Sequence, residues 1–101
     1  MSVVVISRFP VADVANAKQA LASQAALLDE VAEDAKKLGC EHHRFLEGDG
    51  EMVVVDEWQN AEGFQRFFEG NPGVQQFIKS AGVHRPPNIE IFRTVEAAGT
   101  F

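Results

Sequence analysis

The chain has no tyrosine, one cysteine and one tryptophan among its 101 residues. Its lone cysteine, Cys40, cannot form an internal disulfide, so the sequence favours a reducing compartment and we expect a cytoplasmic protein. Basic residues are also scarce, nine against fifteen acidic ones, which gives a formal net charge of −6. Because nucleic-acid binding needs clustered lysine and arginine, this balance argues against a nucleic-acid partner and against attraction to anionic lipid.

Long hydrophobic runs are missing as well. The apolar runs Val3–Ile6 and Met52–Val55 are far too short to span a bilayer, which takes about 20 residues. The N-terminus lacks a basic lead, a long hydrophobic core and a cleavage site, so we expect neither a signal peptide nor a membrane segment. A length of 101 residues with 46% apolar residues fits one folded domain over residues 1–101.

The informative part of the sequence is the stretch Glu51–Phe68. It predicts a strand that ends at the only tryptophan, Trp58, and then a helix that carries three phenylalanines. Both faces of this strand carry apolar residues, whereas a strand with one solvated face would alternate apolar and polar residues. We therefore expect both faces of the strand to be covered.

The remaining elements follow from periodicity, caps and turn residues. Strands are predicted at Ser2–Phe9, Glu41–Glu47 and Asn88–Val95, helices at Val14–Leu38, Ala61–Glu69 and Val74–Ala81, a hairpin turn at Gly48–Gly50 and a tail at Glu96–Phe101. The order is strand, helix, two hairpin strands, helix, strand. This order predicts an α+β fold of the ferredoxin-like βαββαβ type, a four-stranded antiparallel sheet with helices on one face.

The second face of such a sheet has no helices to cover it. The predicted strands nevertheless place Val, Ile or Phe on both faces. The simplest cover for the open face is another copy of the chain that packs sheet to sheet. We therefore expect a homodimer.

The order of elements, Asp56 two residues before Trp58, and the aromatic helix that follows together resemble the antibiotic biosynthesis monooxygenase-like domain of the dimeric α+β barrel superfamily. The resemblance covers nearly the whole chain. It implies protomers that pack sheet to sheet, each with a pocket between sheet and helices. It also implies a cofactor-independent monooxygenase that oxidises a small hydrophobic or aromatic molecule without metal or flavin, the carbanion of the substrate supplying the electrons.

Two branches of that family can be compared residue by residue. Quinone-forming members have an asparagine four residues before the tryptophan and a tyrosine six after it, where this chain has Val54 and Phe64. Haem-degrading members have an asparagine near the end of the first strand, where Ser7 stands, and an iron-ligating histidine on the following helix, where Phe67 or Phe68 stands. Phenylalanine cannot ligate iron, so haem degradation by that route is not expected.

Three residues are the candidates for catalysis. Trp58 would stack on the substrate, and Asp56 or His84 would take a proton, His84 because it lies in a proline-stiffened loop. The adjacent His42 and His43 point to opposite faces of a strand, so no metal site is expected. The residues predicted to line the pocket are Ser7, Phe9, Val54, Phe64, Phe67 and Phe68.

Each of these residues also has a structural interpretation. A buried charge needs a partner, so Asp56 could form a cross-strand ion pair with Arg93 that holds the sheet or the dimer together. Trp58 and the phenylalanines could be ordinary core. Under these interpretations the chain is a non-catalytic module that binds a hydrophobic small molecule, or a structural dimeric barrel with a packed interior.

Overall fold

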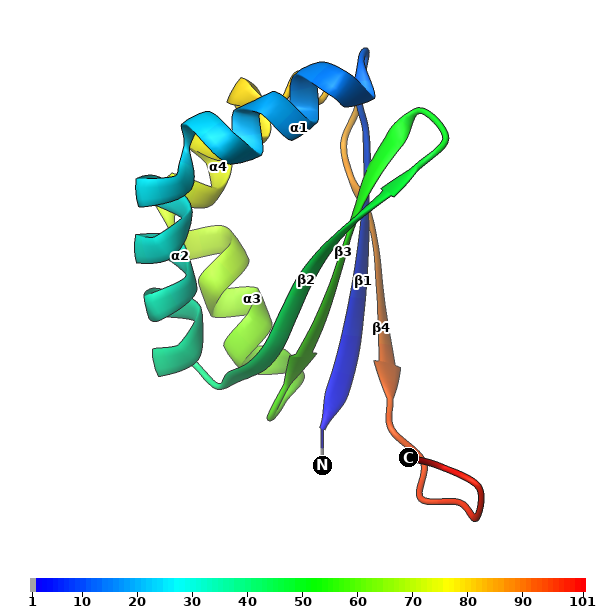
Figure 1. Cartoon of the computed structure of the whole chain (residues 1–101). Coiled ribbons are helices and arrows are strands. Elements are labelled where there is room, and N and C mark those ends of the chain that lie inside the picture. Colours follow the sequence, from blue (N-terminus) through cyan, green and yellow to red (C-terminus); the bar gives the residue numbers. More distant parts are fainter. Residues whose placement is uncertain (1) are drawn as a thin grey trace.

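The computed structural model describes residues 2–101. Four strands form one antiparallel sheet in the order β2-β3-β1-β4 (Figure 1). The strands are β1 (Val3–Pro10), β2 (Cys40–Gly48), β3 (Glu51–Trp58) and β4 (Asn88–Arg93). The predicted ferredoxin-like α+β class is therefore confirmed, and β3 has the predicted bounds.

All four helices lie on one side of the sheet and leave the other side bare (Figure 1). They are α1 (Val14–Ser23), α2 (Ala25–Lys37), α3 (Ala61–Gly70) and α4 (Pro72–Ser80). The Asp13 carboxylate accepts the Ala15 N–H at 2.9 Å to cap α1, and the Asn60 side chain accepts the Gly63 N–H at 2.8 Å to cap α3. Pro72 begins α4 because its fixed φ suits a first helical position.

The prediction of one helix over Val14–Leu38 was wrong, because the helix breaks at Gln24. Gln24 has φ −103° and ψ 21°, outside the helical range, and separates α1 from α2. The hydroxyl of Ser23 donates to the Ala20 carbonyl at 3.3 Å, a bond that competes with the backbone ladder and bends helices. The break turns α2 away from the axis of α1 (Figure 1). Neither Gly nor Pro marks this position, and its one sign in the sequence is that the polar Gln24 interrupts the apolar stripe of the predicted helix.

Two clusters of buried apolar residues join the helices to the sheet. One contains Val3, Val5, Ala35, Trp58, Phe64 and Phe67. The other contains Val11, Ala17, Ala20, Met52 and Ala81. Members of both clusters line a cavity, which therefore lies between them.

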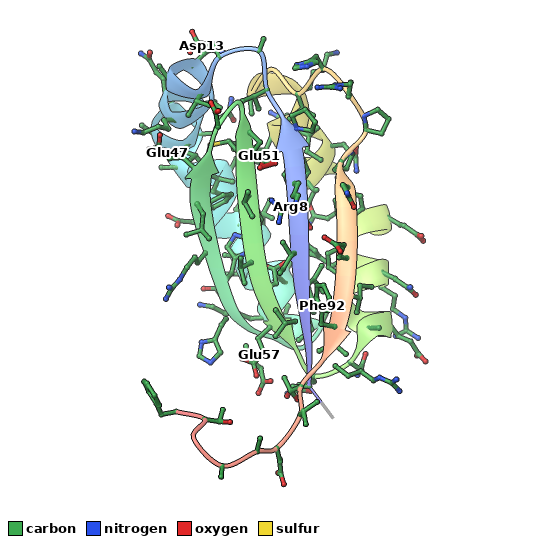
Figure 2. All side chains as sticks on the ribbon, turned by 90° about the vertical axis from the view of Figure 1, so that its right-hand side faces the viewer. Arg8, Asp13, Glu47, Glu51, Glu57 and Phe92 are labelled. Atoms are coloured by element: carbon green, nitrogen blue, oxygen red, sulfur yellow. The ribbon has the colours of Figure 1, made fainter. Side chains whose placement is uncertain are left out.

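The bare face of the sheet is apolar at its centre and charged around it. Val4, Ile6 and Val55 are partly buried there, while Phe92 of β4 is 47% exposed. Figure 2 looks onto this face and shows Arg8, Glu51, Glu57 and Phe92 in front of the helices. Arg8 Nη1 lies 3.3 Å from Glu51 Oε2.

The last strand is shorter than predicted. It ends at Arg93 rather than Val95, although the Thr94 N–H still donates to the Ser2 carbonyl at 3.2 Å. Residues 94–101 are exposed and extend away from the helices (Figure 1). Within residues 2–101, no helix is both long and apolar enough to cross a membrane.

Candidate functional site

A cavity of about 640 Å³ lies between the sheet and the helices. This volume is in the range of small-molecule sites, about 300–1,000 Å³. Its wall is mostly apolar and comes from β1, β2, β3, α2, α3 and α4. All six residues predicted to line the pocket lie in the wall, namely Ser7, Phe9, Val54, Phe64, Phe67 and Phe68, together with the catalytic candidates Trp58 and Asp56.

Trp58 forms the base of the aromatic part of the wall. Its ring has no exposed surface, and it packs against Phe64 at 5.8 Å and Phe67 at 5.4 Å between ring centroids. A ligand can therefore stack on the indole only if one of these phenylalanines moves. That Trp58 stacks on a substrate stays a prediction. The structure does show a hydrogen bond from its indole N–H to Asp56.

Asp56 is a buried carboxylate, 5% exposed, with both oxygens in hydrogen bonds. Its Oδ2 accepts the indole N–H of Trp58 at 3.2 Å. Its Oδ1 lies 2.5 Å from Nδ1 of His43, which is directly opposite on the neighbouring strand. Because the indole N–H can only donate, this contact fixes Oδ2 as an acceptor.

His43 is a cavity-lining residue that the sequence interpretation did not select. Its side chain is 40% exposed, and its imidazole packs edge-on against Phe45 with centroids 4.8 Å apart and planes at 85°. The hairpin turn contained the signal that could have identified it. With Gly48 paired to Glu51 across a two-residue turn, the register places His43 opposite Asp56.

A β-bulge near Glu41 determines what β2 presents to the cavity. Cys40 pairs with Trp58 and His42 pairs with Glu57, so one extra residue lies on β2 between those pairs. Bulges of this kind re-aim side chains and are common beside active sites. As a result Cys40 and His43 share the face that carries the cavity. His42 is paired with Glu57 on the neighbouring strand, and it also borders the cavity.

The thiol of Cys40 is partly buried in this wall. Burial, and secondly the nearby charge of Asp56, raise the pKa of Cys40 from 9.0 to about 11. The thiol donates to the carbonyl of His42 at 3.3 Å. Cys40 is therefore protonated at neutral pH and a poor nucleophile.

Ser7 is a further polar residue of the wall. It is 3% exposed and lies on β1 opposite Val54. Its hydroxyl has no hydrogen-bond partner among residues 2–101, yet it is not sealed within the protein. Since buried hydroxyls are normally paired, this oxygen is free to bond to a molecule in the cavity.

Two expectations from the sequence are not met by the geometry. His84 is exposed in the loop after α4, where its backbone N–H donates to the Pro10 carbonyl at 3.2 Å, and it is not part of the cavity wall. The expected Asp56–Arg93 ion pair is wrong, because β1 separates β3 from β4 and Asp56 bonds to His43 and Trp58 instead.

The part of the chain that the structure describes contains no candidate metal site. Across residues 2–101, no three His, Cys, Asp or Glu side chains converge in an arrangement that could hold an ion. Besides Asp56, His43, Cys40 and Ser7, the cavity is bordered by the polar residues Asp29, Lys36, Glu41, His42 and Arg44.

Comparison with known proteins connects this geometry to one fold group. No protein-family model matches the chain, and no curated protein matches its sequence. Solved structures do match over nearly the full length. SnoaB from Streptomyces nogalater, a cofactor-independent oxygenase, is 16% identical over 98% of each chain with a TM-score of 0.63.

Two further structures extend the likeness. A monooxygenase from the gene ActVA-Orf6 of Streptomyces coelicolor, in complex with nanaomycin D, is 15% identical, with 99% of this chain and 93% of that chain covered and a TM-score of 0.73. A dimeric ferredoxin-like protein from an uncultured marine organism is 12% identical, with 95% and 90% covered and a TM-score of 0.70. At these identities the likeness establishes the fold.

Proposed function

We propose, from the antibiotic biosynthesis monooxygenase-like fold that this chain has, that it is a cofactor-independent monooxygenase acting on a small hydrophobic, aromatic molecule. The observation that carries the proposal is the apolar cavity of about 640 Å³ with a buried, hydrogen-bonded carboxylate in its wall. A pocket with a mostly apolar lining and a few fixed polar groups is the usual form of a small-molecule site.

The reaction would convert an activated methylene group to a ketone. One molecule of oxygen is consumed for each methylene group oxidised. One of its oxygen atoms becomes the ketone oxygen, and the other leaves as water together with the two hydrogens of the methylene. The electrons come from the substrate carbanion once a proton has been removed. Phe64, Phe67 and Phe68 exclude water from this carbanion, and the free hydroxyl of Ser7 bonds to an oxygen substituent of the substrate.

A binding module without catalysis is the second candidate. Val54 and Phe64 stand where the quinone-forming members have asparagine and tyrosine, so the cavity lacks the amide and the phenol of those enzymes. A carrier needs only the apolar wall. Native mass spectrometry of protein purified from its own host would show a retained ligand for a carrier and none for an enzyme that releases its product.

Oxygen uptake tests the enzymatic proposal. Purified protein is mixed with a panel of hydroxyanthrones and hydroquinones in an oxygen electrode cell, and uptake is compared with that of protein denatured by heat. We expect protein-dependent uptake with at least one hydroxyanthrone and a stoichiometry of one oxygen molecule per ketone formed. Uptake no faster than in the denatured control across the panel would remove the enzymatic proposal and leave the binding module.

We also propose that the bare face of the sheet binds a second copy of the chain. Support comes from the partly buried Val4, Ile6 and Val55, from the exposed Phe92, and from a dimeric protein among the structures of the same fold. A two-fold axis through this face would bury the apolar centre against itself. Sedimentation at micromolar concentration would then show a dimer, whereas a clean monomer would contradict this proposal.

A cytoplasmic location is the last part of the proposal. It is supported by the single free thiol, Cys40, since secreted domains of this size commonly rely on disulfides. Fractionation of the native host with an antibody against the chain would test it.

A further inference from the structure

We propose that His43 is the general base of the cavity and that Asp56 positions it, the proton coming from the activated methylene of the substrate proposed above. The inference deepens the function proposed above and rests on it for the presence of a ligand in the cavity. It comes from the His43–Asp56–Trp58 contacts and from the position of His43 in the cavity wall.

The hydrogen bonds of Asp56 determine the tautomer of His43. The Trp58 indole can only donate, so Oδ2 of Asp56 accepts its N–H. In its carboxylate form Asp56 offers acceptors only. Oδ1 of the same carboxylate also accepts, and the group facing it is Nδ1 of His43. In neutral His43 the proton therefore lies on Nδ1, and the lone pair lies on Nε2.

Nε2 is the nitrogen that can act on a ligand. Within residues 2–101 it has no hydrogen-bond partner, and the His43 side chain is 40% exposed where it lines the cavity. The edge contact with Phe45 and the bond to Asp56 hold the ring in one orientation. The ring centroid of Phe45 lies 6.0 Å from that of Phe77 on α4. A chain of ring contacts therefore links His43 to α4.

The environment of this base selects the class of substrate. The carboxylate of Asp56 stabilises the imidazolium that forms when Nε2 takes a proton, which favours proton removal from weak acids. The rest of the wall is mainly aromatic and aliphatic, so the molecule that carries the acidic proton must be largely apolar. Aromatic ketones with an activated methylene, and phenols, combine these two properties.

The step itself is a proton transfer. The C–H bond of the activated methylene breaks and an N–H bond forms at Nε2 of His43. The electron pair of the broken bond stays on carbon and delocalises onto the carbonyl oxygen as an enolate. The positive charge on the imidazole is balanced by the carboxylate of Asp56.

Hydrogen–deuterium exchange in the absence of oxygen tests this step separately from oxidation. Anthrone is incubated with the protein in deuterated buffer under argon, and the loss of the methylene signal is followed by proton NMR. We expect exchange that is faster with the native protein and that falls about 100-fold or more in His43→Gln, since general bases commonly contribute about 10²–10⁴-fold. Glutamine can still donate to Asp56 but is not basic, so it preserves the cross-strand contact.

His84→Gln is the matched control, because His84 is exposed in the loop after α4 and is not part of the cavity wall. It should exchange at the native rate. Asp56→Asn should lower the exchange rate constant about ten-fold with little change in anthrone affinity, because it disturbs the tautomer and not the apolar contacts. Nitrogen-15 NMR of labelled histidine should show the Nδ1–H tautomer in the native protein and its loss in Asp56→Asn.

The outcomes separate this inference from the proposed function. Exchange that depends on His43, without oxygen uptake in air, supports the base and contradicts the monooxygenase. Oxygen uptake that survives in His43→Gln, or exchange equal in His43→Gln and His84→Gln, overturns the base and leaves the monooxygenase intact. Absence of protein-dependent exchange with native protein also overturns it.

Discussion

The two faces of the sheet are built from alternate residues of the same strands, yet they have different chemistry. On the helix-covered face, Asp56 is buried and both of its oxygens are in hydrogen bonds beside an apolar cavity. On the bare face, the adjacent Glu57 lies among apolar side chains with charges around them. A single residue step along β3 therefore separates a positioned carboxylate inside the protein from one on an open surface.

This difference has a physical cause. A polar group enclosed by helices must be paired, so it becomes fixed in geometry, and a fixed geometry is what binding and proton transfer require. A polar group on an open face can exchange its partners for water. We therefore expect ligand binding and proton transfer on the covered face, and dimerisation through the bare face.

The largest expected effect is on association. Ile6→Glu introduces a charge at the centre of the bare face, opposite Val55, and should weaken the dimer by more than about 100-fold because an unpaired charge would be buried. Sedimentation velocity over a concentration series measures it. Gln76→Glu, an equal charge change on exposed α4, is the control and should leave the dimer unchanged. A native dimer constant in Ile6→Glu would place the interface elsewhere.

The covered face can be probed through the thiol of Cys40. Its pKa of about 11 means that at pH 8 the thiolate fraction is about 100-fold lower than for a thiol at 9.0, so alkylation by iodoacetamide should be slower by that factor. The rate should rise about ten-fold per pH unit towards pH 11, and unfolding in urea should abolish the protection. Equal rates in folded and unfolded chain would show that this face is open to water.

The same shift affects folding. Because the pKa of Cys40 is higher in the folded chain, the unfolded chain loses its proton first as the pH rises above about 9. The free energy of unfolding should therefore be constant with respect to this thiol below pH 9 and should fall between pH 9 and 11. Urea unfolding of native protein and Cys40→Ala across this range isolates the contribution.

Removal of neighbouring carboxylates compares the two faces directly. Asp56→Ala leaves the buried indole N–H of Trp58 without its acceptor, and should lower the free energy of unfolding by about 1–3 kcal/mol. Glu57→Ala, one residue along the same strand, should cost about 0.5 kcal/mol or less, as for most surface substitutions. Urea denaturation gives both values. Equal losses would mean that burial does not distinguish the two carboxylates.

The smallest effect concerns the close approach of α3 to Leu38, the residue at the C-terminal end of α2. A Cβ on Gly63 of α3 would lie 2.3 Å from the carbonyl oxygen of Leu38, so Gly63→Ala should cost about 1–2 kcal/mol through forced displacement of backbone. Gly70→Ala, at the end of the same helix, meets no atom within 4 Å and should be neutral or slightly stabilising. Thermal unfolding of the two variants measures the contrast, and similar midpoints would refute it.

Much of the fold could be predicted because it is encoded locally. The β-branched run, the turn at Gly48–Gly50 and the caps Asp13 and Asn60 determine the strands and helix starts through short-range contacts. The break at Gln24 was not predicted, since no Gly or Pro marks it and the bond from the Ser23 hydroxyl to the Ala20 carbonyl is visible only in the structure. The order of elements and the resemblance in fold were confirmed.

The site was harder to predict because it depends on register. Asp56 and Trp58 were selected from sequence, and the structure adds that the two are bonded to each other. The sequence favours His84 over His43 because a stiff loop could place it over a ligand, whereas in the structure His84 is exposed and is not part of the cavity wall. The pairing of His43 with Asp56 follows from the hairpin turn, which fixes the strand register.

The most direct test is a crystal structure of the chain soaked under argon with 1,8-dihydroxyanthrone. We predict the ligand in the cavity between the sheet and α2 to α4, with its methylene carbon within about 3–3.5 Å of Nε2 of His43. A ligand bound outside the cavity, or a cavity closed by Phe64, Phe67 and Phe68 with no ligand in it, would contradict the account.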